Sequence, residues 1–385
     1  MIRRLPVVPQ PLPRESLLSW LGHVATMYDV SRKDMARACG LLGPGDKTTR
    51  IADSGPSSVA YGLSNADAVK VQQATGLAAE DLQRMTWLRF LDSAVKSELA
   101  DAAPRDRFGI MKASWIDPRE LRFCPSCIQE TGGRWFLEWC TPWAFACLHH
   151  GCYLLSECPT CHTALRAGDV ELANGRCRGV ERHRLLGITG RCGIEYQKMQ
   201  APALGDDSLA ELQLLLEQHL AWPEPSSDQA KDDLADLTAM AEFALYLASP
   251  GHLDGADPVV RESFAEFCAG TALGNYRTIH GNPSPMVRTA ALRVASQIVF
   301  STDPWSSARR IADFASRPLH SRVLPLHQAW LKEPPKDTTR RLERIVRSVR
   351  IAAPSVRTPD RRVVPAPRLR SVSRRGGRSS DRAGD

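Results

Sequence analysis

The stretch LRFCPSCIQETGGRWFLEWCTPWAFACLHHGCYLLSECPTC, residues 121–161, decides how the middle of this chain folds. Together with the residues up to Cys192, it holds nine of the eleven cysteines. Two CxxC pairs flank a CxxH, and a turn of this kind can present two ligands to one tetrahedral zinc ion. The stretch therefore predicts a structural zinc module.

The first predicted site combines three cysteines with one histidine: Cys124, Cys127, Cys147 and His150. Both pairs leave two residues between their ligands, and Pro125 sets the backbone angle of the first turn. His149 is a weaker ligand candidate than His150, because it does not give that interval. The aromatic residues of the intervening segment are interpreted as a small core over these turns rather than as a surface that stacks on bases.

The second predicted site opens with Cys158 and Cys161, and Pro159 repeats the chemistry of the first turn. Cys177 and Cys192 are the natural closing ligands, although fourteen residues separate them. His162 and His183 remain alternatives. The two cysteines left over, Cys140 and Cys152, are expected to pack as small hydrophobic side chains.

Other uses of these cysteines fit the pattern less well. A thiol–disulfide exchange site is expected to have one CxxC in a βαβ setting, and this chain has several pairs with a CxxH between them. A disulfide scaffold is disfavoured because the chain is long enough to bury an ordinary core and lacks a secretory signal. Four protein ligands leave no open position for catalysis, and the HExxH and HxE…PCxxC patterns are absent.

Composition places the chain among globular proteins of two or three domains. The proline-broken N-terminus has no apolar signal core, and no run of eighteen apolar residues could span a membrane. We therefore expect a reducing, cytoplasmic setting at the bacterial nucleoid, without membrane association. The net charge of +7 is concentrated at one end, since residues 340–385 contain fourteen arginines and four acidic residues.

The N-terminal region predicts two helical pairs. Apolar residues at intervals of three or four, from Leu17 to Tyr28, predict one helix, and a capping box of Ser31 and Asp34 opens a second that ends at Gly40. This pair is compatible with a helix-turn-helix whose basic residues face DNA phosphates, or with an ordinary helical hairpin that has a solvated basic face. The candidate DNA contacts are Arg32, Lys33 and Arg37.

A similar pair follows the loop at residues 43–58. Ser64 and Asp67 form a second capping box, Gly76 turns the chain, and the next helix is expected from Glu80 to Trp87. This repetition favours a helical domain of the DNA-binding kind.

Three blocks of the sequence resemble the TniQ family of transposon target-selection proteins, which are relatives of TnsD. They are PLPRESLLSWLGHVA, ATGLAAEDLQRMTW and LRFCPSCIQE…W…CLHHGCYLLSECPTCHTAL, and the resemblance covers roughly residues 8–195. It implies a helix-turn-helix domain, a zinc-ribbon domain that contains the first site and opens a second, and a variable helical C-terminal half. The departure lies after Cys161, where the family usually closes with a tight cysteine pair.

The expected fold is mainly α-helical with a small zinc-ribbon module. Helical stripes after residue 200 predict a bundle, with Ser208 and Glu211 capping its first helix. We expect a helical domain at 1–115, a zinc-ribbon domain with one or two Zn²⁺ ions at 116–200, a helical domain at 201–350 and a disordered arginine-rich tail at 351–385. Further candidate DNA contacts, at helical spacing, are Arg340, Arg341, Arg344 and Arg347.

These features predict a binding protein rather than an enzyme. The segment GPGDKT at residues 43–48 lacks the complete phosphate-loop motif, so ATP hydrolysis is not expected. The resemblance implies an adaptor that binds DNA or a target-bound complex, such as a guide-RNA effector complex. It would recruit a AAA+ ATPase regulator (TniB- or TnsC-like) and, through it, a DDE transposase (TniA- or TnsB-like). Alternatives are a stand-alone zinc-containing transcription regulator and, more weakly, a zinc-dependent nucleic-acid enzyme.

Overall fold

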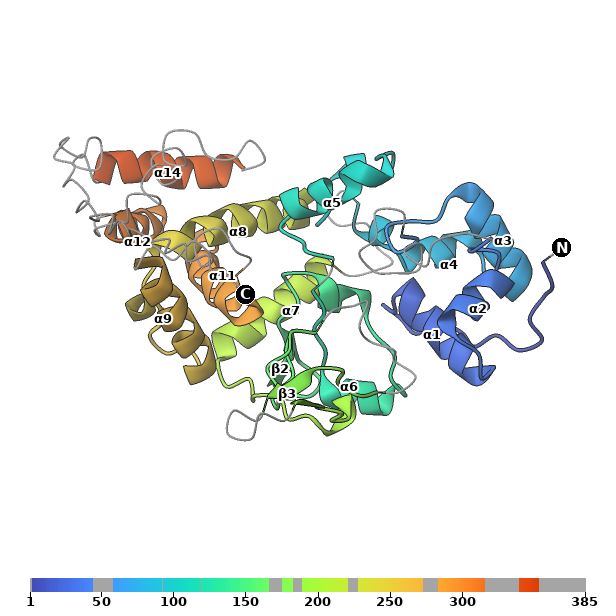
Figure 1. Cartoon of the computed structure of the whole chain (residues 1–385). Coiled ribbons are helices and arrows are strands. Elements are labelled where there is room, and N and C mark those ends of the chain that lie inside the picture. Colours follow the sequence, from blue (N-terminus) through green and yellow to red (C-terminus); the bar gives the residue numbers. More distant parts are fainter. Residues whose placement is uncertain are drawn as a thin grey trace, which may run out of the picture.

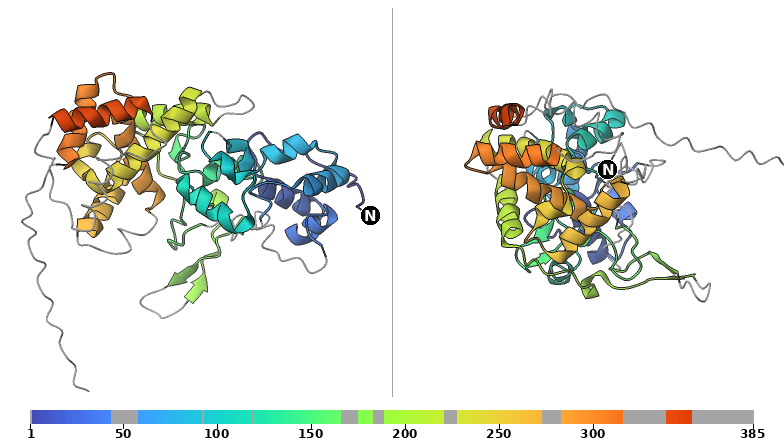
Figure 2. Two further views of the ribbon diagram at one scale, coloured as in Figure 1. Left: turned by 90° about the horizontal axis from the view of Figure 1, so that it is seen from above. Right: turned by 90° about the vertical axis from the view of Figure 1, so that its left-hand side faces the viewer.

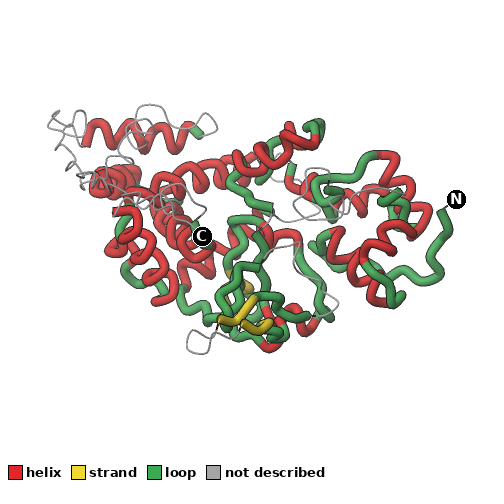
Figure 3. The backbone as a smooth tube through the Cα atoms, viewed as in Figure 1, coloured by secondary structure: helices red, strands yellow, loops and turns green. Residues whose placement is uncertain are grey.

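The computed structural model describes residues 2–43, 58–91, 93–118, 120–165, 175–182, 189–220, 228–272, 283–315 and 339–352. Across these ranges the chain is mainly helical, and its strands form two short hairpins. Figure 1 follows the chain from the N-terminal helices through the cysteine-rich module to the C-terminal helices, and Figure 3 separates helices from loops. The mainly helical class predicted from the sequence is confirmed. None of the described helices is both long and apolar enough to cross a membrane.

The N-terminal region begins with two helical pairs, α1 (Leu17–Met27) with α2 (Arg32–Ala38) and α3 (Asn65–Thr75) with α4 (Ala79–Arg84). The two predicted helix starts are N-caps: the hydroxyls of Ser31 and Ser64 accept from the backbone N–H of Asp34 and Asp67, each at 3.1 Å. The carboxylates of Asp34 and Asp67 accept from those hydroxyls at 2.6 and 2.9 Å, which differs from the reciprocal bond of a capping box. A further helix, α5 (Pro104–Ala113), leads to the cysteine-rich module.

The second helical pair is shorter than its sequence predicts. Gly76 ends α3 with φ = 79°, a left-handed conformation that glycine adopts without steric cost. The following helix α4 stops at Arg84 instead of continuing to Trp87. Trp87 begins a separate 3₁₀ turn up to Phe90, and both rings are buried, so core packing rather than helix periodicity places them.

The cysteine-rich module contains one short helix and the two hairpins. Helix α6 (Pro125–Glu130) starts directly after Cys124. Strands β1 (Ala146–Cys147) and β2 (Cys152–Tyr153) pair antiparallel, as do β3 (Val180–Arg182) and β4 (Thr189–Arg191). In Figure 2 the β3–β4 hairpin projects away from the helices.

Aromatic rings form the core of this module. Phe123, Trp135 and Tyr196 are almost fully buried and meet pairwise, with ring centroids 5.4–6.1 Å apart. Trp139 joins them edge-on against Trp135 at 6.3 Å. The interpretation of the aromatic segment as core rather than as a base-stacking surface is confirmed for these rings.

The C-terminal region is a bundle of six described helices: α7 (Asp207–His219), α8 (Asp228–Leu247), α9 (Pro258–Ala272), α11 (Pro285–Val299), α12 (Pro304–Ala315) and α14 (Arg340–Ala352). Helix α11 packs against α8 and α9, and α12 packs against α14. The predicted stripe on α11 is confirmed, since Ala290, Val294 and Ile298 are buried. The predicted cap of α7 is wrong: the side chain of Asp206 accepts from the N–H of Ser208 and Leu209.

The three regions share their packing. One continuous apolar core contains residues from the N-terminal helices, from the module and from the C-terminal bundle. The amide of Gln213 on α7 accepts from the N–H of Phe145 and Ala146, and the hydroxyl of Tyr153 donates to Asp257 at 2.6 Å. The module is therefore held between the two helical regions.

Candidate metal centres and basic surfaces

The first predicted ligand set comes together in the structure. The ligand atoms of Cys124, Cys127, Cys147 and His150 all lie within 4.8 Å of one another. Cys124 directly precedes helix α6 and Cys127 lies in it, while the β1–β2 hairpin supplies Cys147 and His150. The Sγ atoms of Cys127 and Cys147 are 3.6 Å apart, and His150 Nδ1 lies 3.3–3.5 Å from all three sulfurs. The four residues thus surround one point with their donor atoms.

These separations fit a tetrahedral zinc ion. With Zn–S of about 2.3 Å and Zn–N of about 2.0 Å, tetrahedral angles place two sulfurs about 3.8 Å apart and a sulfur and a nitrogen about 3.5 Å apart. The three cysteines are buried, and the side chain of His150 is 17% exposed. Close hydrogen bonding from Cys127 and then Cys147 lowers the pKa of the Cys124 thiol, and the contact with Cys124 raises the pKa of Cys127 and of Cys147. In the absence of an ion the three thiols therefore favour one shared thiolate, on Cys124.

Cys140 and Cys152 both pack against the apolar core of the module, as predicted. The Sγ of Cys152 also lies 3.7 Å from the Sγ of Cys124, a contact that the sequence did not predict. It arises from the β1–β2 register, which places Cys152 opposite Cys147. Cys152 is half-buried beside the cluster without belonging to the group of four.

The second ligand set is completed by the β3–β4 hairpin. The Sγ atoms of Cys158, Cys161, Cys177 and Cys192 lie within 4.8 Å of one another. Cys158 and Cys192 are 3.7 Å apart, and Cys161 and Cys177 are 3.6 Å apart, again the spacing of thiolates on one ion. Strands β3 and β4, which lie between Cys177 and Cys192 in the sequence, pair antiparallel, so the two cysteines meet in space despite the long interval.

The alternative histidines do not join this second cluster. The side chain of His162 is 75% exposed and faces Glu157 at 3.7 Å. His183 lies outside the described residues. All eleven cysteines fall within the described ranges and all are free thiols, so neither cluster contains a disulfide.

One residue at the first cluster was not predicted from the sequence. The carboxylate of Glu130 lies 2.9 Å from Nε2 of His150, on the ring edge that faces away from the sulfurs. Its place three residues after Cys127 was the available signal, because residues three apart share a face once the segment is helical, as α6 is.

The basic residues of α2 do not form one free surface. Lys33 and Arg37 are exposed, and Arg37 pairs with Asp34 of its own helix at 2.8 Å. Arg32 is half-buried and lines a small hollow between α1 and the cysteine-rich module. The corresponding helix of the second pair, α4, exposes Glu80 and Asp81, both paired with Arg84. The two helical pairs therefore differ in the sign of the charge that they expose.

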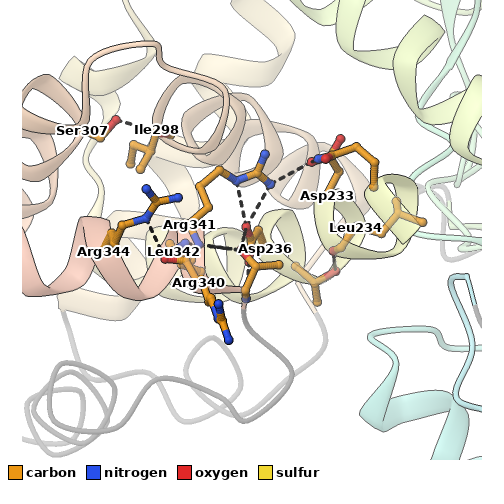
Figure 4. A network of polar contacts seen from close by, with 12 residues as sticks. Asp233, Leu234, Asp236, Ile298, Ser307, Arg340, Arg341, Leu342 and Arg344 are labelled. Atoms are coloured by element: carbon orange, nitrogen blue, oxygen red, sulfur yellow. Dashed lines mark hydrogen bonds and ion pairs between the residues drawn. The ribbon is translucent and has the colours of Figure 1, made fainter. Parts of the chain in front are cut away.

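The four C-terminal arginines on helix α14 fall into two groups, and Figure 4 shows three of them, Arg340, Arg341 and Arg344. Arg341 lies in a network with Asp233 and Asp236 of α8, at 2.8 and 2.9 Å, so it serves the packing of α14. Arg340, Arg344 and Arg347 are exposed. At 100° per residue they form a stripe opposite the buried apolar face of the helix, which consists of Leu342, Ile345 and Val346. The predicted tail beyond residue 352 lies outside the described residues.

Two comparisons with known proteins bear on this chain. Residues 6–154 match the protein-family model TniQ. The matched segment contains the N-terminal helices and the whole of the first cluster, and it ends before the second cluster begins. No curated protein matches the chain.

Proposed function

We infer from TniQ-family membership, shown over residues 6–154, that this chain is a target-selection adaptor for DNA transposition. The family is associated with transposition, and that coarse assignment holds for the chain. The adaptor role is the finer step, and the observation that carries it is the coincidence of the family match with the Cys124–His150 cluster. The adaptor performs no chemistry of its own: it binds a target and presents it to other proteins.

Two structural zinc ions hold the central module in this proposal. The first would be bound by Cys124, Cys127, Cys147 and His150, and the second by Cys158, Cys161, Cys177 and Cys192. Support comes from the donor atoms, which are soft thiolates and an imidazole at the spacing that zinc requires. Zinc supplies folding energy to such a module by fixing its turns. With four protein ligands at each centre, no coordination position is left for a substrate or a water molecule, so both ions are proposed to be structural.

The helical pairs of the N-terminal region are proposed as helix-turn-helix units, within the domain boundaries expected from the sequence. The positive charges of helix α2 support the first pair as the one that approaches DNA. Lys33 and Arg37 are exposed on this helix, and Arg32 is half-buried beside them. Exposed acidic side chains on α4 would repel phosphates, so the second pair is assigned to packing or to a protein partner.

The exposed stripe on α14 is the second proposed DNA contact. Arg340, Arg344 and Arg347 project from a docked helix, and the sequence continues from it into an arginine-rich segment. Such contacts neutralise phosphates without reading sequence, and they weaken as salt rises. Arg341 is withdrawn from the predicted contacts, because Asp233 and Asp236 engage its guanidinium.

The proposed protein partners are recruited after the adaptor has bound its DNA target. A AAA+ ATPase regulator would bind the adaptor at its target, and a DDE transposase would follow through the ATPase. The target would be read either by the adaptor directly or through a guide-RNA effector complex, in the cytoplasm at the nucleoid.

A pull-down with the AAA+ protein encoded beside this chain tests the proposal. Retention at low salt, increased by target DNA, is the expected result. Absence of association alongside specific DNA binding would contradict the adaptor role and favour a stand-alone transcription regulator. Metal-dependent turnover of DNA by the purified chain would contradict the non-catalytic role.

The DNA contacts are tested separately by measuring affinity against salt concentration. Replacing Arg340, Arg344 and Arg347 together by Ala should weaken binding and make the slope of log affinity against log salt shallower by about 0.9 for each lost phosphate contact. Arg105→Ala is the matched control, because the side chain of Arg105 is 88% exposed on α5 away from this stripe. The triple variant removes three charges and the control removes one, so a change in slope for Arg105→Ala about one third as large as that of the triple variant would indicate loss of general charge rather than loss of a contact.

A further inference from the structure

The two ring nitrogens of His150 face different partners. Its Nδ1 lies 3.4, 3.3 and 3.5 Å from the sulfurs of Cys124, Cys127 and Cys147. Its Nε2, on the opposite side of the ring, lies 2.9 Å from Oε1 of Glu130. A neutral imidazole carries a proton on one ring nitrogen and a free lone pair on the other. If Nδ1 uses its lone pair to bind a metal, the proton must therefore be on Nε2.

We propose that Glu130 is a positioning residue of the first metal centre. Its carboxylate accepts the Nε2–H of His150, which holds the proton on that nitrogen and leaves the Nδ1 lone pair directed at the three sulfurs. The inference rests on the proposed zinc site. It adds to that site a carboxylate partner that selects the tautomer and the orientation of the histidine ligand.

The fold gives Glu130 this role through helix α6. Cys127 and Glu130 are three residues apart on the same short helix, so the segment that carries a ligand also carries the partner of another ligand. His150 reaches the same place from the β1–β2 hairpin, twenty residues further along the chain. The contact between Glu130 and His150 therefore joins the two elements that supply all four donor atoms.

The neighbouring histidine offers a comparison within the molecule. His149 Nε2 lies 3.7 Å from the other carboxylate oxygen of Glu130, and its side chain is 74% exposed. It has no sulfur partner in the cluster of four. Because its side chain is exposed and its Nε2 lies beyond hydrogen-bond distance of Glu130, His149 lacks the orienting contact that His150 receives.

The exposure of the Glu130 side chain determines how much metal affinity should be lost when this residue is replaced. Removing the hydrogen-bond partner of a metal-bound histidine typically weakens metal binding about 10- to 100-fold. The side chain of Glu130 is 55% exposed, so water can replace part of its hydrogen bond. We therefore expect a loss near tenfold, the lower end of that range.

Zinc affinity of the full-length protein, measured by competition with a chromophoric chelator, tests this inference. Glu130→Ala should weaken the first centre about tenfold, and Glu130→Gln should recover part of that loss because its amide oxygen still accepts from Nε2–H. His149→Ala should change the affinity less than twofold. The first centre is identified in the titration as the one that Cys124→Ser removes.

The histidine tautomer gives a second readout, by heteronuclear NMR of the imidazole nitrogens. In metal-free wild-type protein, at a pH high enough that the imidazole is neutral, His150 should carry its proton on Nε2, and this preference should be lost in Glu130→Ala. Unchanged zinc affinity in Glu130→Ala, or an equal loss in His149→Ala, would overturn the role of Glu130 and leave the zinc site standing. Wild-type protein that holds no zinc at this centre would overturn the site itself.

Discussion

The carboxylate of Glu15 lies 2.9 Å from the guanidinium of Arg134, although 119 positions separate them in the sequence. Glu15 directly precedes the Ser16 cap of α1, and Arg134 lies in the cysteine-rich module. Both side chains are buried, and Ser19 also donates to the Glu15 carboxylate at 2.9 Å. Burial raises the pKa of Glu15 against the lowering effects of Leu12 N–H and Arg134. This pair ties the N-terminal helices to the module.

Arg134→Ala should destabilise the protein by about 3–5 kcal/mol, because it leaves the Glu15 carboxylate buried without its cation. The measurement is chemical denaturation monitored by circular dichroism. Arg37→Ala is the matched control: its pair with Asp34 is exposed at 44% and 58%, so a loss of about 1 kcal/mol or less is expected. Equal losses in the two variants would contradict the structural role of the buried pair.

Cys124→Ser and Cys152→Ser should differ in zinc content. The first removes a ligand and should lower the content from two ions per chain to one, with partial unfolding of the module. Cys152 stands next to Cys124 outside the group of four donors, so its serine variant should keep both ions. Elemental analysis of freshly purified protein measures both. Loss of an ion in Cys152→Ser would show that the ligand set is misassigned.

Removal of zinc should expose the cluster cysteines to alkylation while Cys39 remains unreactive. Burial raises the pKa of Cys39 to about 12, so at pH 8 it stays a protonated thiol, which is not nucleophilic. Native protein treated with iodoacetamide, with and without a strong chelator, can be compared by peptide mass spectrometry. Cluster cysteines that react equally in both samples would argue against bound metal. Alkylation of Cys39 would instead indicate global unfolding.

Asp236→Ala should release helix α14 from the bundle. This fully buried carboxylate accepts from the N–H and hydroxyl of Thr339 and from Arg341, at 2.7–3.0 Å, as Figure 4 shows in part. Its loss leaves those donors unpaired, at a cost of about 1–3 kcal/mol for a buried group. Faster hydrogen exchange confined to residues 340–352 is the expected result. Asp228→Ala on the same helix α8 is the control, since Asp228 is fully exposed.

Salt-dependent DNA binding should weaken in the same variant if α14 presents its arginines from a docked position. Asp236 carries no contact to DNA in the proposal, and its removal makes the chain more positive. A weaker affinity in Asp236→Ala, with Asp228→Ala unchanged, would therefore reflect the placement of Arg340, Arg344 and Arg347 rather than net charge. Stronger binding in both variants would favour a simple charge effect.

Local patterns in the sequence were enough to predict the ligand turns and the helix starts. Cys124 and Cys127, or Ser31 and Asp34, are close in space wherever the chain forms a turn or a helix, because the intervals of two or three residues fix their separation. The same holds for the apolar stripe of α11, which the helical period alone places on one face. These predictions needed no knowledge of the rest of the chain.

The sequence by itself thus determined the two opening ligand pairs, the mainly helical class and the basic C-terminal end. Only the tertiary structure decided that Cys177 and Cys192 meet across a hairpin, that Cys152 abuts Cys124, and that Glu130 holds His150. The tertiary structure also showed that Arg341 pairs with the buried Asp236 of helix α8, so its guanidinium is not free for DNA. The physical reason is that these contacts join elements through the packing of a shared core, and the spacing of residues along one element carries no record of which other element will lie beside it.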